Sequence, residues 1–450
     1  MTPASWIYLF FVVLVVIAMV KKHGVGLITT LGIFVIGFHY TGNLVGALQT
    51  VFRAYFNAGT SLFDLILMIA VMVGMLKAMK NIGADYLMVY PIRAVLKNPT
   101  VSFFVLGFVM YVCSLFFWPT PATALVGAVL IPVAVRSGLP LMGAAMTVNI
   151  FGHGMGLSGD FIIQGAPALT SRAAGVDIVS VVSAGTILSL ITGITASVVA
   201  YFLIRKEIGS SSSSQSEDEV KRPLGSFPSC AKWIAIAVPV AFTLATMTMV
   251  SQSISGAGST ALLGGVATLF IVVICIVDHG KKSLEAMEKY FVEGLLFSMK
   301  IFAVVIPIAG FFYLGSPANS QAILGEGAPG FLFEIGKAVA EVVPLSPFPV
   351  AFGMMIVGLV TGLDGSGFSG LPLVGTLASS LGSTMNIDIS VLAAIGQVSS
   401  IFCGGGTLVA WATVAVAGIA GVDPLELARK NFIPVISGLI LATVVGAFLM

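Results

Sequence analysis

The chain has 450 residues, of which 58% are hydrophobic and only 9% are charged, and its mean hydropathy is +1.07. So few polar side chains cannot cover the surface of a water-soluble globule, which is therefore excluded. The formal net charge of +2 and the scattered basic residues argue against a nucleic-acid partner. The four widely separated cysteines argue against a disulfide framework or a CxxC metal site.

Apolar runs of about 20 residues recur along the chain, and each is long enough to cross a hydrocarbon layer of roughly 30 Å. They lack the alternating polarity of barrel strands, so the spans are expected to be helices. We predict an all-α polytopic protein of the plasma (inner) membrane, with the lipid bilayer as a partner.

The first half, residues 1–204, opens with scaffold helices within residues 1–97. Three spans are predicted there, at about 6–20, 24–41 and 62–80. Basic residues near span ends mark the cytoplasmic side, and Lys21 and Lys22 follow the first span, so the N-terminus is predicted outside. The first span lacks a basic n-region and a small-residue cleavage site, so we expect a retained helix.

Residues 98–175 are predicted to form a re-entrant hairpin and a broken helix. The hairpin has two apolar arms that meet at residues 118–123 (WPTPAT), where two prolines suit a tip. The broken helix contains residues 152–160 (GHGMGLSGD), and each glycine destabilises a helix by about 1 kcal/mol relative to alanine. A closing helix at 177–204 completes the half.

The polar stretch at 205–229 contains Ser210 to Ser214 followed by acidic residues, and it predicts a flexible cytoplasmic linker. Residues 230–450 then repeat the order of the first half. Scaffold helices are predicted within 230–347, a hairpin and a broken helix within 348–421, and a closing helix at 428–449. The second tip is predicted at 364–370 (DGSGFSG) and the second break at 403–407 (CGGGT).

Short matches between the halves support an internal repeat. Leu125-Val126-Gly127 corresponds to Leu373-Val374-Gly375, Gly175-Val176-Asp177 to Gly421-Val422-Asp423, and the Tyr, Phe and Gly of residues 55–59 to those of residues 290–294. Basic residues orient equivalent helices in opposite directions, which predicts the inverted repeat common in secondary transporters. The total is about ten crossing helices plus two hairpins.

Unwound backbone at membrane depth is tolerated only where protein or a watery cavity covers it, so the tips and breaks predict one central polar cavity. Free amides and half-helix N-termini suit a carboxylate, and freed carbonyls suit a sodium ion. The predicted substrate-binding residues are Thr120, Pro121, Thr123, Asn149, Gly154, Ser158, Ser366, Ser369, Gln397, Gly404, Gly405 and Thr407. Carbonyls of Gly365, Gly367 and Gly406 are candidates for Na⁺. The alternative is that these glycines only let helices pack closely.

Three titratable residues near the breaks are candidates for ion coupling. Asp160 and Asp364 are the nearest carboxylates, and an acid within the membrane costs at least about 2.5 kcal/mol on insertion scales. They could bind the coupling ion or cap a helix by accepting hydrogen bonds from free amides. His153 lies between two glycines and could carry a proton, or it could satisfy neighbouring backbone groups.

The layout of inverted halves, each with a hairpin and a glycine-broken helix, resembles the ion transporter superfamily. That group includes dicarboxylate and citrate carriers, gluconate permeases and the large membrane subunit of tripartite carriers. The resemblance covers nearly the whole chain and rests on architecture. The Ser-Asn-Thr hairpin signature of the sodium-dicarboxylate branch is replaced here by residues 120–123 (TPAT) and 365–367 (GSG).

The resemblance implies a secondary active transporter that moves a small organic anion with Na⁺ or H⁺ by elevator-type alternating access. A cation/proton antiporter is the alternative, favoured by the buried aspartates. An ion channel fits less well, because paired hairpins argue against a permanently open pore. No ATP-binding P-loop or cofactor motif is present, so we expect no enzyme activity and no cofactor besides the coupling ion. A homodimer is one assembly compatible with the sequence.

Overall fold

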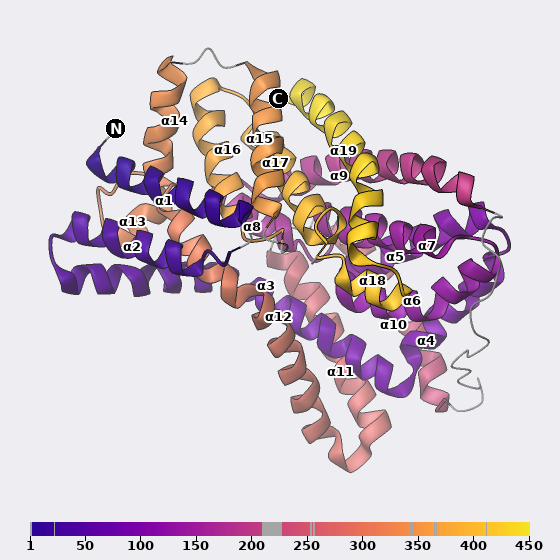
Figure 1. Cartoon of the computed structure of the whole chain (residues 1–450). Helices are drawn as coiled ribbons and strands as arrows, with labels where there is room; N and C mark the ends of the chain where they lie inside the picture. The colour runs from indigo at the N-terminus through magenta and orange to yellow at the C-terminus, as the bar shows by residue number, and fades with distance from the viewer. Residues whose placement is uncertain are drawn as a thin grey trace.

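The computed structural model describes residues 2–21, 23–208, 227–252, 254, 257–342, 346–363, 365, 367–410 and 412–450. These residues form helices and connecting turns without a strand (Figure 1), so the prediction of an all-α polytopic membrane protein is confirmed. Among them, seven helices are long and apolar enough to cross a membrane, or nine if each bent pair counts as one span. The seven include Pro99–Phe117 and Pro119–Arg136, which were predicted as hairpin arms, and shorter apolar helices lie at Pro3–Ala18, Gly26–Thr41 and Pro347–Gly362, so the count of ten crossing helices stays a prediction.

The scaffold of the first half contains a helix that is longer than predicted. Its elements are α1 (Pro3–Val20), α2 (Gly26–Thr41), α3 (Leu44–Ile82), α4 (Ala84–Val89) and η1 (Tyr90–Val95). The side chain of Asn43 caps α3 by accepting a hydrogen bond from the Gly46 amide at 2.7 Å. Hydropathy alone located only its second part, because polar residues such as Gln49 and Arg53 interrupt the apolar run of the first part.

The scaffold of the second half also has more helix than predicted. Its elements are α10 (Ser229–Ser251), α11 (Ala257–His279), η5 (Gly280–Lys282), α12 (Ser283–Tyr313), α13 (Pro317–Leu324) and α14 (Phe331–Val342). The segment that follows α12 contains α13 and α14. The helix α13 forms a bent pair with the end of α12 that together is long and apolar enough to cross a membrane.

The equivalent helices α3 and α12 pack side by side and run antiparallel (Figure 1). A Cβ atom added at Gly294 would lie 2.0 Å from the Ala70 carbonyl oxygen, and one added at Gly310 would lie 2.9 Å from that of Ala54. Glycine therefore lets the two backbones approach closely, as small residues do between membrane helices. This antiparallel pair is the arrangement that an inverted repeat requires.

The closing helices α9 (Ile178–Ile204) and α19 (Pro424–Leu449) form a second antiparallel pair. Gly438 faces the Thr192 carbonyl, with 2.3 Å between that oxygen and an added Cβ atom. Lys430 near the start of α19 forms an ion pair of 2.5 Å with Glu207, just after the end of α9. The two antiparallel pairs agree with the predicted inverted repeat, and the orientation of the chain in the membrane stays a prediction.

Helices lie at the positions where the hairpins and broken helices were predicted, and whether the hairpins are re-entrant stays a prediction, because each arm of the first is long enough to cross a membrane. Hairpin one is α5 (Pro99–Phe117) and α6 (Pro119–Arg136), and hairpin two is α15 (Pro347–Gly362) and α16 (Leu371–Met385). Broken helix one is α7 (Leu141–Val148), η2 (Asn149–Gly156) and α8 (Gly165–Ala174). Broken helix two is α17 (Ile389–Phe402), η6 (Cys403–Thr407) and α18 (Val414–Ala420).

The glycine run of the first half is not unwound, which corrects one prediction. Residues 149–156 continue the helix as a π-helix, and the chain leaves the helix only at 159–164. Neighbouring side chains explain why the glycines are there, because an added Cβ atom at Gly156 would lie 2.7 Å from Cβ of Ser114. The second run is also a π-helix, but Gly406 has φ 132°, a conformation that favours glycine.

Candidate functional site

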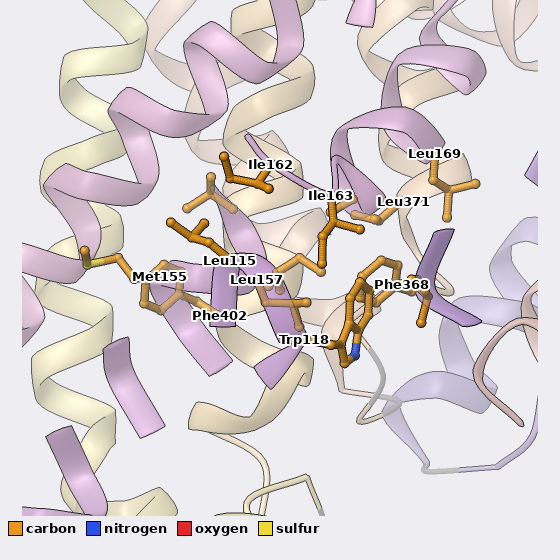
Figure 2. Close-up of a cluster of buried hydrophobic side chains, with 14 of the residues drawn as sticks. Leu115, Trp118, Met155, Leu157, Ile162, Ile163, Leu169, Phe368, Leu371 and Phe402 are labelled. Carbon is orange, nitrogen blue, oxygen red and sulfur yellow. The ribbon is translucent and has the colours of Figure 1, made fainter. Parts of the chain in front are cut away.

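The two hairpin tips meet through aromatic side chains. Trp118, at the first tip, has a backbone φ of 68°, and its ring lies 5.4 Å from that of Phe368 at the second tip, centroid to centroid. Figure 2 shows this pair among buried apolar side chains, including Leu115, Leu157 and Leu371. The contact between the tips is therefore apolar, whereas the sequence predicted a polar lining there.

His153 connects three elements at the centre of the molecule. Its Nδ1 lies 2.9 Å from the Gly405 carbonyl oxygen of η6, and its Nε2 lies 3.1 Å from Oγ1 of Thr123 on α6. The carbonyl can only accept, so Nδ1 carries a hydrogen and donates it. Nε2 of the neutral ring accepts from Thr123; if the ring is protonated, Nε2 donates and the hydroxyl turns to the Pro119 carbonyl, 2.8 Å away.

Asn149 links the two breaks. Its Nδ2 donates to the Gly406 carbonyl at 2.5 Å, and its Oδ1 accepts from Nδ2 of Asn431 at 2.8 Å. Asn431, on α19, also donates to the Thr407 carbonyl at 3.2 Å. Both asparagines are fully buried. The structure thus brings Asn149, Gly406 and Thr407 together through Asn431, a residue that the sequence did not single out.

Gln397 makes the corresponding contact from the second half of the chain to the first. Its Nε2 donates to the Ser158 carbonyl at 2.9 Å, while its Oε1 is buried without a hydrogen-bond partner. The Ser158 hydroxyl lies 2.8 Å from that of Ser189 on α9, which also contacts the Met155 carbonyl at 3.0 Å. Ser158 and Gln397 are therefore neighbours, as the prediction of one site requires.

Asp160 caps a helix. Its Oδ1 accepts from the Ile163 amide at 2.9 Å and its Oδ2 from the Gly165 amide at 2.8 Å, where α8 begins. The carboxylate is 2% exposed and compensates the free amides at this helix start. Asp364 and Ser366, the other predicted residues at the second tip, lie outside the described residues.

The remaining predicted residues divide into packing positions and surface positions. An added Cβ atom at Gly154 would lie 2.5 Å from the Phe402 ring, and one at Gly404 would lie 2.2 Å from the Gly362 carbonyl. The Gly367 carbonyl accepts from the Ser400 hydroxyl at 3.1 Å, Thr407 donates to the Phe402 carbonyl, and Ser369 is buried. Thr120 is exposed, and Pro121 and Gly365 are half-buried. Their roles in substrate or ion binding stay predictions.

A pocket of about 220 Å³ lies beside the first break, between α8 and the scaffold. None of the predicted substrate-binding residues lines it. Its lining is Asp64, Ile163, Gln164, Ala168, Ser171, Arg172, Val176, Asp177, Ile178 and Thr260. Arg172 was missed by sequence reasoning, although a lone arginine twelve residues after Asp160 in an apolar segment is a usable signal.

Two polar atoms of this pocket are buried without a hydrogen-bond partner: Nη1 of Arg172 and Oε1 of Gln164. The other arm of the guanidinium, Nη2, forms an ion pair of 2.6 Å with Asp64 of α3. Gln164 is only 7% exposed and has a backbone φ of 61°. The pocket is therefore lined by two residues that each keep one buried polar atom without a hydrogen-bond partner, a donor on Arg172 and an acceptor on Gln164.

The chain is similar over its full length to a membrane protein of Bacillus subtilis. It is 37% identical to "Uncharacterized membrane protein YhfA" of Bacillus subtilis (strain 168), over 100% of this chain and 98% of that protein. No protein-family model matches the sequence.

Proposed function

The chain belongs to the family of the Bacillus subtilis membrane protein YhfA, and we propose that it is a secondary active transporter for a small organic anion. Transport would be coupled to Na⁺ or H⁺ and would proceed by elevator-type alternating access. The substrate class is a small molecule that carries a carboxylate.

The observation that carries this proposal is Arg172, which lines a pocket next to a helix break and whose Nη1 has no hydrogen-bond partner. A guanidinium arm without an acceptor is costly when buried, and a carboxylate is the acceptor that matches its geometry. Gln164 lines the same pocket, and its Oε1 is a second buried polar atom without a partner. The volume of about 220 Å³ suits a small metabolite.

The ion pair between Arg172 and Asp64 supports the elevator part of the proposal. Arg172 belongs to broken helix one, which would move with the hairpins, and Asp64 belongs to the scaffold helix α3. Movement of one unit against the other must break this contact. A substrate carboxylate that binds Arg172 replaces part of the stabilisation that the Asp64 carboxylate gives to the guanidinium. Substrate binding would therefore lower the free energy needed to move broken helix one against the scaffold.

Thermal unfolding of the purified protein with a panel of organic acids tests the proposal. A true ligand at 100 times its Kd stabilises by about 2.7 kcal/mol. Arg172→Gln is expected to weaken binding at least about tenfold, since a hydrogen bond to a charged group contributes about 1.5–3 kcal/mol. Lys430→Gln, which removes an ion pair of another helix pair, is the matched control and should bind normally. The proposal fails if no organic acid stabilises the protein, or if Arg172→Gln binds as well as the control.

A cation/proton antiporter is a second candidate, favoured by the charges of the same pocket. Asp64 and Asp177 oppose a single arginine, so the lining carries one net negative charge. That balance favours a cation unless a ligand carboxylate displaces Asp64. Proton movement driven by sodium without any organic acid would support the antiporter.

A further inference from the structure

We propose that the substrate of the pocket lined by Arg172 is a small amino acid, a zwitterion whose carboxylate pairs with Arg172 and whose ammonium group pairs with Asp177. The inference rests on the proposed function, from which it takes the carboxylate at Arg172, and it adds a second recognition group on the same pocket. It narrows the substrate from any small carboxylate to one that also carries a positive charge.

One tight turn places both charged residues on the pocket. Gly175 follows α8 with a left-handed backbone, φ 71°, and its amide donates to the Ser171 carbonyl. The Val176 amide donates to the same carbonyl at 3.1 Å, which closes the turn between α8 and α9. Arg172, near the end of α8, and Asp177, just before α9, therefore both line the pocket.

Asp177 lies at the start of α9 without capping it. Its backbone angles, φ −64° and ψ 137°, suit a capping residue, but its side chain makes no capping hydrogen bond. At the equivalent position of the repeat, Asp423 has φ −71° and ψ 127° and caps α19 by accepting from the Glu426 amide at 2.8 Å. The backbone therefore allows a cap at both positions, whereas Asp177 is exposed and lines the pocket instead.

This difference between the two halves coincides with the arginine. The offset between the two aspartates also places Gly418 at the position of Arg172. The second half thus has a capping aspartate and no arginine, while the first half has an arginine and an aspartate that does not cap. Their joint occurrence on one pocket indicates a pair of groups that binds a ligand.

Arg172 and Asp177 do not pair with each other. The guanidinium forms its ion pair with Asp64 at 2.6 Å, and among the described residues it forms none with Asp177. The side chains of Arg172 and Asp64 stay 33% and 45% exposed, so a ligand can compete for the guanidinium. A ligand that contacts both Arg172 and Asp177 needs a negative group for the first and a positive group for the second.

Charge balance favours a zwitterion over a plain acid. The pocket lining contains two carboxylates, Asp64 and Asp177, and one guanidinium, so it carries one net negative charge. A monocarboxylate would add a second negative charge, and like charges at close range repel each other. An amino acid leaves the net charge unchanged and gives each of its charged groups an opposite partner.

The rest of the pocket suits a short apolar side chain. Its volume of about 220 Å³ is small for a ligand site. The apolar residues of its lining are Ile163, Ala168, Val176 and Ile178. Amino acids of the size of alanine or valine are therefore expected to bind better than those with a long or charged side chain.

Thermal unfolding of the full-length protein in detergent tests the two recognition groups separately. Alanine, valine and 4-aminobutyrate are each compared with the acid that lacks the ammonium group: propionate, 3-methylbutyrate and butyrate. They are also compared with the amine that lacks the carboxylate: ethylamine, isobutylamine and propylamine. At least one amino acid is expected to raise Tm in a saturable way, while its acid binds at least about tenfold more weakly and its amine has no effect.

Asp177→Asn keeps the shape of the side chain and removes the partner of the ammonium group. The affinity for the amino acid should fall at least about tenfold, and the affinity for the matching acid should rise, because one repelling charge is gone. Asp423→Asn is the matched control and should keep the wild-type preference, since asparagine caps a helix about as well as aspartate. Tm without ligand should change little in either variant.

The outcomes separate this inference from the proposed function. An acid that stabilises as strongly as its amino acid, or unchanged amino-acid binding in Asp177→Asn, overturns the inference and leaves a carboxylate transporter standing. Stabilisation by the amines alone overturns both, because the pocket then binds a cation. If none of these compounds raises Tm, the inference is wrong, and the wider panel of organic acids with Arg172→Gln decides the proposed function.

Discussion

At the scale of single residues, the contact between His153 and Thr123 joins a hairpin tip to both breaks. The imidazole lies between the Thr123 hydroxyl and the Gly405 carbonyl, and the hydroxyl has two acceptors within reach. A change in the proton of Nε2 reverses the direction of one hydrogen bond and turns the hydroxyl toward Pro119. The hydrogen bond between His153 and Thr123 is therefore either a fixed structural contact or one whose direction depends on the protonation of His153.

Thr123→Val should destabilise the protein through His153. The substitution keeps the shape of the side chain and leaves Nε2 buried without a partner, which costs about 1–3 kcal/mol. Thr376→Val is the matched control, because the Thr376 hydroxyl is equally buried and contacts only backbone carbonyls of its own helix. Denaturant unfolding of both variants provides the comparison. Equal losses of stability would show that the contact with His153 contributes nothing.

Asp64→Asn should strengthen carboxylate binding with little loss of stability. Both partners of the Arg172–Asp64 ion pair are partly exposed, at 33% and 45% of their side chains, and such pairs contribute about 0–1 kcal/mol. Removing the competing carboxylate leaves the guanidinium free for the substrate. Glu293→Gln, which opens the similar Lys77–Glu293 pair, should leave binding unchanged. Weaker binding by Asp64→Asn in a thermal-shift titration would contradict the assigned role of Arg172.

At the scale of helices, the backbone contact between α3 and α12 depends on one glycine more than on its repeat equivalent. Gly294→Ala would place Cβ 2.0 Å from the Ala70 carbonyl oxygen, and the helices must separate, at a cost of about 1–3 kcal/mol. Gly59→Ala, at the equivalent position, meets no atom within 4 Å and gains helix propensity. Tm measurements should show a clear loss for the first and none for the second. Similar Tm values would mean that α3 and α12 do not approach as closely as described.

The helices also show which features of the fold could be predicted from the sequence. Continuous apolar runs locate most spans, and the proline pair at the first tip locates hairpin one, because both signals are local. The first break lies at 159–164 instead of the glycine run, since contacts from Phe402 and Ser114 let the run stay helical and Asp160 stabilises the new helix start. Such contacts come from distant parts of the chain.

For the same reason, only part of the site could be predicted from the sequence. Asn149, His153, Ser158 and Gln397 were singled out by their place near the breaks, and the structure shows them joining the two halves. Arg172 was not, because its importance depends on the neighbouring helix α3 and on an unpaired nitrogen atom. Asn431 was not singled out either, because its contacts with Asn149 and Thr407 join parts of the chain that are far apart in sequence.

At the scale of the whole molecule, the antiparallel helix pairs agree with the prediction that the two halves enter the membrane from opposite sides. Thr2 lies within 3.0 Å of Glu334, hydroxyl to carboxylate, so the N-terminal residues and α14 lie on the same side. The basic residues Lys281 and Lys282 are predicted on the cytoplasmic side. Membrane topology can therefore be tested from three separate elements.

Labelling of intact cells with an impermeant thiol reagent tests that topology. Thr2→Cys and Glu326→Cys should react, and Lys281→Cys should react only after the cells are opened. The background carries Cys230→Ser, because the other three cysteines are buried. Reaction of Lys281→Cys in intact cells would mean that the chain is oriented the other way.

Uptake into reconstituted vesicles tests the central claim most directly. With a labelled organic acid that stabilises the protein, an imposed Na⁺ or H⁺ gradient should drive accumulation by the wild type, and Arg172→Gln should reduce it at least about tenfold while Lys430→Gln does not. A pH-sensitive dye in the same vesicles reports the alternative. Sodium-driven proton movement without organic acid, lost in Asp160→Asn, together with no uptake of any acid, would contradict the account and establish the antiporter.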